Sequence, residues 1–290
     1  MARPIVVTGA RGIVGSHVVT RLLEAGQVVW ALSRNPSGDE PTSGVQVIQG
    51  DLDEPSTLLA ALEGAGALVL VARPDTAEEV VAIAEQAGIE QVVVISSAAV
   101  TAGYDTTWHL PVERAVRASS MAWSIVRPGE FAINSLWIWG PSIRQRRRVV
   151  EPFPDQVGSP VHERDVADIV VANLLDVGRR NRVDTVVGPD WLSKRQQVAA
   201  IAAAIEATIA VDVATPEEAR EFYLAQGGFA GDNAEFLFGY ESYDGVSGEQ
   251  DESVDQPRSI YQTIDEILGR PARTYVEWVG DHVAEFRSGP

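Results

Sequence analysis

The sequence predicts an α/β fold, with a doubly wound parallel sheet and a smaller, mostly helical C-terminal lobe. Three observations lead to this prediction. Short apolar runs alternate with helical patterns up to about residue 190, a glycine-rich turn follows the first run, and helical patterns dominate from residue 192. Alternating strands and helices form right-handed βαβ units, and near-continuous Val, Ile, Leu and Ala runs are typical of parallel strands buried on both faces.

The expected strands are short apolar runs, at residues 4–8, 28–32, 45–48, 67–71, 91–95, 123–126 and 184–187. The expected helices lie between these runs, at 13–25, 55–62, 76–87, 110–118 and 163–175. In the helical segments apolar residues recur with a period near 3.6 residues, whereas the strands are continuous apolar runs. The order predicts that the carboxyl ends of the strands meet at one edge of the sheet.

The C-terminal part carries further helical patterns, at 193–207, 216–226, 230–239, 260–268 and 275–286. Between two of them, the acidic segment 241–256 is rich in Gly and Ser, which predicts a mobile loop. We therefore expect a core at 1–190 and a helical lobe at 191–290. The two parts are expected to share one substrate cleft.

Composition and charge argue against several classes of protein. No apolar run approaches about 18 residues, so no membrane span is expected, and the N-terminal segment has no signal-peptide pattern. The absence of cysteine excludes disulfides and thiolate catalysis. A net charge of −18 disfavours binding to nucleic acid. We expect a cytoplasmic monomer or homodimer.

A glycine-punctuated turn follows the first expected strand and opens the first expected helix. Gly9 allows a sharp turn, Gly12 lets a pyrophosphate approach the backbone, and Gly15 lets the helix pack close to the strand. The N–H groups of Gly12, Ile13 and Val14, together with the helix dipole, favour an anion. The turn predicts a dinucleotide site on a Rossmann core; the alternative is the same turn with an empty site.

Two arginines favour NADP(H) over NAD(H). An NAD site usually has Asp or Glu at the end of the second strand, to bind the ribose hydroxyls. This chain has Ser33 and Arg34 there, and Arg11 lies within the glycine turn. A guanidinium pairs bidentately with a phosphate, so both arginines suit the 2′-phosphate of NADP(H). For Arg34 the alternative is a solvated strand end.

The order of eight sequence blocks resembles that of the NmrA-like group of atypical short-chain dehydrogenases/reductases, over nearly the whole chain. The blocks are VTGARGIVG, ALSRNP, GDLDEPSTLLAAL, VVISSAAV, WSIVRPGEFAIN, VHERDVADIVVANLL, VVGPDWLS and PARTYVEWVGDHVAEFR. The resemblance implies an NAD(P)-binding fold with the cofactor along the strand ends. RPGEF would then shape the nicotinamide and substrate region.

The resemblance also implies roles for three pairs of residues. It places Asp51 and Leu52 beside the adenine, Ala72 and Arg73 along the cofactor, and Ser96 and Ser97 at the end of the fifth strand; the alternative for Asp51 is a turn or helix cap.

The usual proton relay of this superfamily, Tyr-x-x-x-Lys, is absent. Lys194 is the only lysine and lies far downstream of the position that the relay requires. Glu113 resembles the acidic residue that follows the relay lysine by four positions. Counting back four residues from Glu113 places His109 at the lysine position, and counting back four more places Asp105 at the tyrosine position. A reductase of this group therefore needs another proton source.

Three residues near this position are candidate catalytic groups: Ser97, Tyr104 and His109. An imidazole near neutrality suits proton transfer, and a serine polarises a carbonyl. The alternatives are structural: His109 caps or packs at a helix start, and Ser97 closes a strand. His162 and Asp165 are expected to cap a helix or support the cleft.

Aromatic side chains at expected cleft positions predict a small apolar or aromatic substrate. They are Trp108, Phe131, Trp137, Phe222 and Phe229, for which the alternative is a place in the core. The basic run 144–148 predicts a solvated surface or an interface, against an anionic-substrate site as the alternative. His109, His162 and His282 lack metal-ligand spacing, so we expect no metal.

Three functions are compatible with these features. The first is an NADPH-dependent oxidoreductase that acts on an apolar carbonyl, quinone or enone without the Tyr-x-x-x-Lys relay. The second is a non-redox biosynthetic cyclase or isomerase on the same fold. The third is an NmrA-like regulator that senses NADP through a protein partner. The missing relay supports the second and third, and the cofactor signals support the first.

Overall fold

The computed structural model describes residues 3–36, 44–238 and 261–287. Contacts divide the described residues into two compact units. The first takes them from 1–128, 163–186 and 259–270, and the second from 129–162, 187–258 and 271–290. Each unit is thus built from several chain segments. A division at residue 190 into core and lobe stays a prediction.

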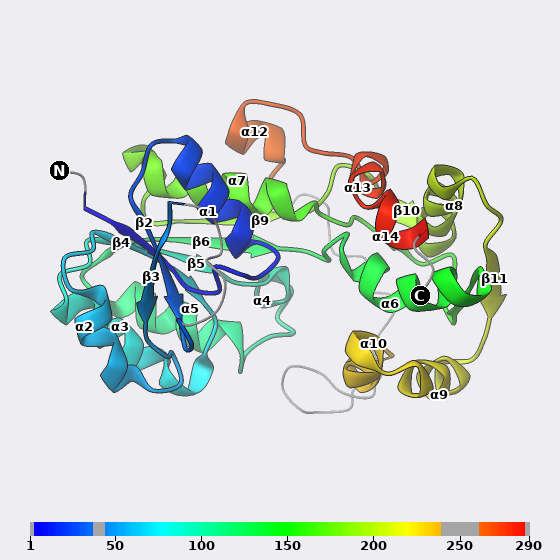
Figure 1. The fold of residues 1–290 in the computed structure, drawn as a ribbon, viewed down its shortest axis with the longest axis horizontal. Coiled ribbons are helices and arrows are strands. Elements are labelled where there is room, and N and C mark those ends of the chain that lie inside the picture. Colours follow the sequence, from blue (N-terminus) through cyan, green and yellow to red (C-terminus); the bar gives the residue numbers. More distant parts are fainter. Residues whose placement is uncertain (1–2, 37–43, 239–260, 288–290) are drawn as a thin grey trace. The chain divides into compact units, whose positions relative to one another are not determined.

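The first unit contains one seven-stranded sheet in the order β3-β2-β1-β4-β5-β6-β9, and every neighbouring pair is parallel (Figure 1). The strands are β1 (Ile5–Val7), β2 (Val29–Ser33), β3 (Gln46–Gln49), β4 (Ala67–Val71), β5 (Gln91–Ile95), β6 (Ala122–Pro128) and β9 (Arg182–Val186). The direction of chain progression reverses between β1 and β4. This confirms the doubly wound parallel sheet, and the reversal is the point where such sheets bind ligands.

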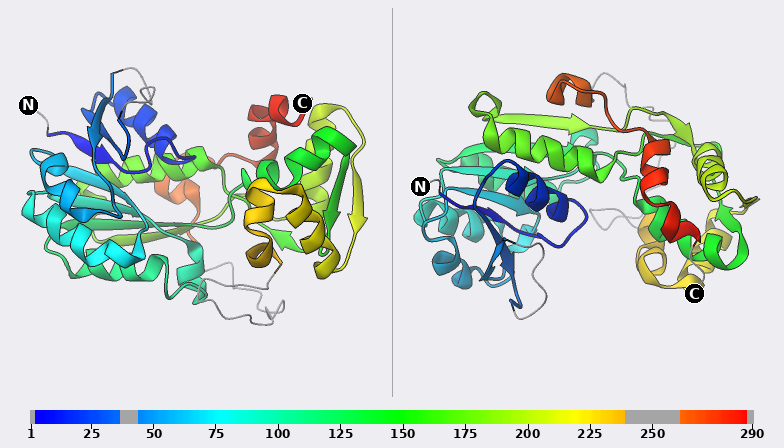
Figure 2. Two further views of the ribbon diagram at one scale, coloured as in Figure 1. Left: turned by 60° about the horizontal axis from the view of Figure 1, so that its bottom comes forward. Right: turned by 45° about the horizontal axis from the view of Figure 1, so that its top comes forward.

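Helices cover both faces of this sheet (Figures 1 and 2). On one face α1 packs on α7, and α7 on α12; on the other α3 packs between α2 and α5. Their bounds are α1 (Gly15–Glu24), α2 (Leu58–Leu62), α3 (Ala77–Gln86), α5 (His109–Ala118), α7 (Glu163–Leu175) and α12 (Ile264–Leu268). The segment expected as one helix at 55–62 begins instead with a 3-10 turn, Pro55–Thr57. Helix α4 (Ala98–Ala102), which the sequence did not predict, follows β5.

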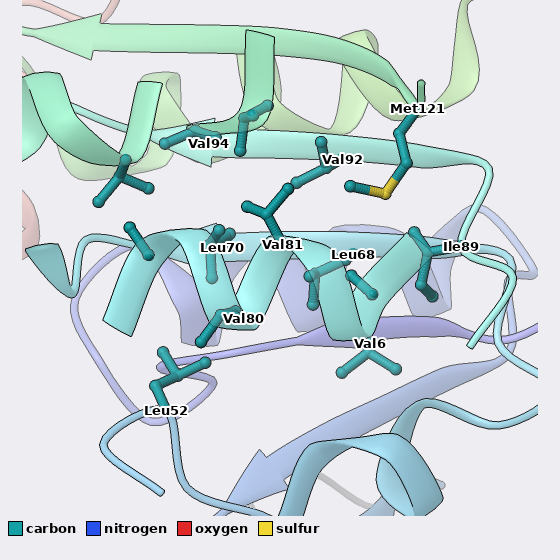
Figure 3. Close-up of a cluster of buried hydrophobic side chains, with 14 of the residues drawn as sticks. Val6, Leu52, Leu68, Leu70, Val80, Val81, Ile89, Val92, Val94 and Met121 are labelled. Atoms are coloured by element: carbon teal, nitrogen blue, oxygen red, sulfur yellow. The ribbon is translucent and has the colours of Figure 1, made fainter. Parts of the chain in front are cut away.

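The core between the sheet and α3 is made of aliphatic side chains (Figure 3). Val6, Leu68, Val92 and Val94 from the strands meet Val80 of α3, and all five are almost fully buried. Burial of this kind contributes about 1.5–3 kcal/mol for each large aliphatic side chain. It explains why the strands read as continuous apolar runs, since both faces of the sheet are covered.

The second unit is helical, as expected, but it also contains two small sheets. Parallel β7 (Arg148–Glu151) and β11 (Ala210–Val213) form one, and antiparallel β8 (Val157–Gly158) and β10 (Leu192–Ser193) form the other. The helices are α6 (Asn134–Arg146), α8 (Lys194–Ile205), α9 (Pro216–Gln226), α10 (Gly228–Asp232), α11 (Ala234–Leu237), α13 (Tyr275–Asp281) and α14 (Val283–Arg287). The acidic segment 241–256, predicted to be a mobile loop, lies outside the described residues. Within the described ranges, no helix is long and apolar enough to cross a membrane.

A buried ionic cluster closes the β9 side of the sheet. The carboxylate of Asp184 has no exposed surface, and it accepts hydrogen bonds from Asn173 at 2.8 Å, Arg179 at 3.1 Å and Arg182 at 2.8 Å. Arg179 itself is buried. Because neither charge is well hydrated, each depends on the other for its stability.

Replacing Asp184 with Asn is therefore expected to lower the free energy of unfolding by about 3 kcal/mol, since it leaves the Arg179 charge buried without a counter-ion. Urea denaturation of the purified variant measures the effect. Asp155→Asn is the matched control, because Asp155 is 80% exposed and pairs with the exposed Arg195. An unchanged denaturation midpoint for Asp184→Asn would show that the cluster does not stabilise the fold.

Candidate functional site

The predicted cofactor residues gather at one edge of the first unit. Because all seven strands are parallel, their carboxyl ends lie at the same edge. The glycine turn follows β1, Ser33 and Arg34 end β2, Ala72 and Arg73 follow β4, and Ser96 follows β5. The glycine turn and the Ala72–Arg73 segment flank the reversal between β1 and β4. This edge is the candidate dinucleotide site.

The glycine turn is tight enough to require glycine at two positions. Gly9 has a φ of +62°, a left-handed conformation that side chains disfavour. A Cβ added to Gly15 would lie 2.1 Å from the carbonyl oxygen of Gly9, and one added to Gly12 would lie 3.1 Å from the same oxygen. Helix α1 therefore approaches the turn as closely as its backbone allows.

The start of α1 suits an anion. The helix has no side-chain cap and no acidic residue in its first turn, so its dipole and N–H groups are available to a phosphate. One detail differs from the expectation: the N–H of Gly12 donates to the carbonyl of Gly9 at 2.8 Å inside the turn. The predicted phosphate contacts therefore fall to Ile13 and Val14.

Thr8, which was not among the predicted site residues, anchors the glycine turn to the sheet. Its buried hydroxyl donates to the carbonyl of Val69 and accepts from the N–H of Val71, both at 2.9 Å. These bonds join the end of β1 to β4 at the reversal point. A hydroxyl at the end of an otherwise apolar strand was the available signal, because a buried hydroxyl needs hydrogen-bond partners.

An ionic network fixes α1 against α7 and so holds the turn in place. The Arg21 guanidinium donates to Asp168 at 2.7 Å, and Arg270 donates to Asp165 at 2.6 Å and to Asp168 at 2.5 Å. Hydrogen bonds to Glu24 and Asp168 raise the pKa of Arg21, which keeps it charged. Asp165 is thus a structural anion within α7, as the supporting role predicted for it implies.

The two arginines predicted to bind the 2′-phosphate, Arg11 and Arg34, are exposed on the glycine turn and at the end of β2. Ser33 shapes the turn after β2, because its hydroxyl donates to the carbonyl of Asn35 at 2.9 Å. Exposure leaves the arginine side chains accessible to a ligand from solvent. Their contacts with the cofactor stay predictions.

The segment predicted to lie beside the adenine is linked to the segment predicted to lie along the cofactor. Arg73 pairs with Asp53 at 3.2 Å, and the hydroxyl of Thr76 donates to the carbonyl of Leu52 at 2.7 Å. The carboxylate of Asp51 accepts the N–H of Asp53 at 3.0 Å and so forms a turn, which is the alternative role given for Asp51. That role uses one carboxylate oxygen and is compatible with an adenine contact.

The remaining cofactor candidates are fixed by neighbouring backbone or by a buried network. Ala72 is buried, and its carbonyl accepts from the side chain of Arg73 at 3.1 Å. The hydroxyl of Ser96 is buried and donates to Glu113 at 2.6 Å, and Glu113 is also bound by Arg127. These contacts tie the ends of β4 and β5 in place.

The three catalytic candidates differ in their surroundings. The hydroxyl of Ser97 accepts the N–H of Ala99 at 3.2 Å and so caps α4, a structural role other than the strand end given as its alternative, and its catalytic role stays a prediction. Tyr104 is 53% exposed. His109 opens α5, and its Nδ1 lies 2.5 Å from an oxygen of Asp105, whose side chain has no exposed surface.

Asp105 is a functional candidate that the sequence reading missed as a partner of His109. Its second oxygen accepts the N–H groups of Trp108 and His109, each at 3.0 Å, so the carboxylate caps the start of α5. The spacing Asp-x-x-x-His was the available signal. The spacing is informative only once the helix is known to begin at His109, because the carboxylate of Asp105 then accepts the free backbone N–H groups at the helix start.

The predicted substrate aromatics are divided between the units. Trp108, 45% exposed, lies in the first unit. Phe131, Trp137, Phe222 and Phe229 lie in the second. There, Trp137 and Phe229 have ring centroids 4.7 Å apart, and Phe222 meets Tyr223 edge to face at 5.1 Å. These pairs pack within the second unit, and their contact with substrate stays a prediction.

Lys194, the only lysine of the chain, belongs to the second unit and pairs with Glu130 at 2.6 Å. His162 lies 3.4 Å from Asp281.

The basic run 144–148 is divided among separate partners in the second unit. Arg144 donates to the carbonyl of Glu285 at 2.9 Å, and Arg148 pairs with Asp212. Among the described residues, no group of three or more His, Asp or Glu side chains could hold a metal ion.

The family model that describes NAD(P)H-binding proteins matches residues 9–177 of the chain. The chain belongs to the NAD(P)H-binding family. This assignment confirms the NAD(P)-binding fold that the resemblance implied, and the fold is similar to that of NmrA, a negative transcriptional regulator, with a TM-score of 0.71, 17% identity and coverage of 97% of this chain and 95% of that one. The assignment also confirms the expectation of a nicotinamide dinucleotide site.

Two full-length relatives are reductases by name. The (4-alkanoyl-5-oxo-2,5-dihydrofuran-3-yl)methyl phosphate reductase of Streptomyces griseus subsp. griseus is 31% identical, over 97% of this chain and 99% of its own. The NAD(P)H azoreductase of Xenophilus azovorans is 30% identical, with the same coverage. In fold, the chain is similar to the Citrobacter sp. triphenylmethane reductase complexed with NADP(H), with a TM-score of 0.76, 19% identity and coverage of 97% and 99%.

The close approach at Gly15 gives a direct test of the glycine turn. Gly15→Ala is expected to weaken NADPH binding at least tenfold, because a methyl group at 2.1 Å from the Gly9 oxygen forces α1 away from the turn. Displacements of this kind cost about 1–3 kcal/mol. Quenching of intrinsic fluorescence by NADPH measures the affinity. Gly280→Ala is the control, since a Cβ there meets nothing within 4 Å; equal affinities for the two variants would contradict the assignment.

Proposed function

We propose that this protein is an NADPH-dependent reductase of a small apolar or aromatic carbonyl compound, quinone or enone. The observation that carries the proposal is the glycine turn at the reversal of the sheet, where a Cβ on Gly15 would lie 2.1 Å from the Gly9 oxygen. Such a turn serves to bring a pyrophosphate against bare backbone. Membership of the NAD(P)H-binding family and two reductase relatives support the redox role.

NADP(H) is proposed over NAD(H) because the ribose end of the site is cationic. Arg34 follows β2 at the position where an NAD site carries a carboxylate, and Arg11 lies in the turn after β1. An exposed guanidinium forms charge-assisted bonds to a 2′-phosphate, whereas it has no comparable anionic partner on the NADH ribose.

The substrate class follows from the side chains at the expected substrate positions. Trp108, Phe131, Trp137, Phe222 and Phe229 offer large apolar surfaces. The Streptomyces relative is named for an oxo-dihydrofuran phosphate, which supports a conjugated carbonyl compound as acceptor. A cytoplasmic monomer or homodimer without nucleic-acid or membrane partners completes the proposal.

The chain's own residues bind and orient the reactants. Bound NADPH supplies a hydride, which carries two electrons and one hydrogen nucleus. When NADPH is bound, Ile13 and Val14 would hold the pyrophosphate, and Arg11 and Arg34 would hold the 2′-phosphate. Asp51 and Leu52 would lie beside the adenine, and Ala72 and Arg73 along the cofactor. A proton must then reach the reduced acceptor. Ser97, Tyr104 and His109 are the proposed groups near the end of β5.

NADPH oxidation tests the function directly. We expect the protein to oxidise NADPH, followed at 340 nm, with at least one of menadione, 1,4-benzoquinone and 2-cyclohexenone, and each NADPH consumed to yield one reduced acceptor. Tight NADPH binding with no oxidation would contradict the reductase and favour an NADP-sensing regulator. Binding of neither nucleotide would favour a non-redox cyclase or isomerase, the function that the missing relay suggests.

Arg34→Ala tests the choice of cofactor. The Kd for NADPH is expected to rise about tenfold, because one charge-assisted hydrogen bond contributes roughly 1.5–3 kcal/mol, and the Kd for NADH is expected to stay within about twofold. Isothermal titration calorimetry measures both constants. Arg195→Ala removes an exposed arginine that pairs with Asp155 in the second unit and serves as control. An equal effect of Arg34→Ala on both nucleotides would argue against a 2′-phosphate contact.

A further inference from the structure

We propose that Asp105 and His109 act together as the proton relay of this protein, with His109 as the acid and Asp105 as the residue that positions it. This inference rests on the proposed reductase function and names its proton source. His109 begins α5 and Asp105 lies just before it, at the two positions where counting back from Glu113 places the Lys and Tyr of the superfamily relay. The relay is thus not lost from this part of the fold but is replaced by a different pair.

The geometry of Asp105 is that of a fixed orienting group. Its carboxylate has no exposed surface, and each oxygen has a separate task. Oδ1 accepts the backbone N–H groups of Trp108 and His109 at 3.0 Å, and Oδ2 lies 2.5 Å from Nδ1 of His109. Because three hydrogen bonds hold it, the carboxylate cannot turn away from the imidazole without uncapping α5.

This arrangement selects one tautomer of His109. A carboxylate accepts hydrogen bonds and donates none, so Nδ1 must carry the proton that faces Oδ2. Proton exchange with the acceptor then falls to Nε2. A buried carboxylate at Nδ1 is the usual device for fixing an imidazole in one orientation and stabilising its protonated form during proton transfer.

The backbone connects the pair to the end of β5. The N–H of Asp105 donates to the carbonyl of Ala99 at 3.3 Å, and the N–H of Ala99 donates to the hydroxyl of Ser97 at 3.2 Å. Ser97 is the second residue after β5, at the sheet edge that carries the other site residues. The hydroxyl of Ser97 caps α4, whereas His109 has an orienting carboxylate at its ring, so the acid role is assigned to His109.

The reaction balances with one proton from the imidazolium. Hydride addition leaves a negative charge on the acceptor oxygen, as an alkoxide, phenolate or enolate. Nε2 of His109 gives its proton to this oxygen, which becomes a hydroxyl group. The imidazole is then neutral, with its remaining proton on Nδ1 bonded to Asp105, and a proton from solvent restores the imidazolium. The sum is NADPH, acceptor and one proton giving NADP⁺ and reduced acceptor.

Asp105→Asn tests the positioning role without uncapping the helix. The amide oxygen must take the place of Oδ1 to accept the two backbone N–H groups, so the NH₂ group faces Nδ1 and donates to it. His109 is therefore expected to change to the Nε2–H tautomer, which ¹⁵N chemical shifts of the imidazole report in the intact protein. An unchanged tautomer would overturn the role of Asp105, independently of any activity.

The catalytic role is measured with whichever of the three acceptors the wild-type protein reduces fastest. Asp105→Asn and His109→Gln are each expected to lower kcat about 100-fold, with the Kd for NADPH within twofold of wild type. The double variant is expected to lose no more than either single variant, since the two residues act as a unit. Wild-type kcat in His109→Gln would overturn the relay and leave the reductase function standing.

A matched control is offered by another carboxylate–imidazole pair, Glu285 with His282 at 3.2 Å in the second unit. Glu285→Gln removes the same charge from an exposed pair and is expected to leave kcat unchanged. A fall in kcat equal to that of Asp105→Asn would overturn the specific role of the dyad. Absence of NADPH oxidation in the wild-type protein, in contrast, would overturn the proposed function, and the relay with it.

Discussion

The close approach of α1 to the turn after β1 is the constraint on which the candidate site depends. Only a backbone without side chains fits where Gly15 passes the carbonyl of Gly9, and the same closeness directs the start of the helix toward the sheet edge. Thr8 fixes the turn to β4, and Arg21 fixes the far end of the helix to α7 through Asp168. The glycine turn, where the phosphate is predicted to bind, is therefore fixed to β4 directly and to α7 through α1.

The sequence predicts the first unit well because its strands are buried on both faces. For β4 and β5 the predicted bounds agree with the structure, as do those of α7. In the second unit the bounds of α9 agree as well, because its helical pattern is also long and regular. The short strands β7 and β11 escaped prediction for the opposite reason. They have four residues each and carry the exposed Arg148–Asp212 pair, so no continuous apolar run or alternation distinguishes them from loops.

The candidate site was predictable in its parts and less so in its contacts. Glycine spacing and the arginine after β2 could be interpreted because their chemistry is local. The pairing of Asp105 with His109 depends on where α5 begins, and helix starts are uncertain without a recognisable cap. Here the cap is Asp105 itself, four residues before His109 in a loop whose hydroxyl-rich sequence masks it. The same carboxylate therefore both begins α5 and binds the ring of His109, so neither could be predicted without the other.

The division of the chain has a consequence for how the protein is made. The first unit includes α12 and Arg270, which donates to Asp165 and Asp168 of α7, although most of the chain separates Arg270 from the glycine turn and α1 in sequence order. During synthesis, the α1–α7 network cannot close until residue 270 has left the ribosome. The first unit is thus completed late, after most of the second unit has been translated, and a truncation that removes Arg270 would also remove the cation that binds Asp165 and Asp168 of α7.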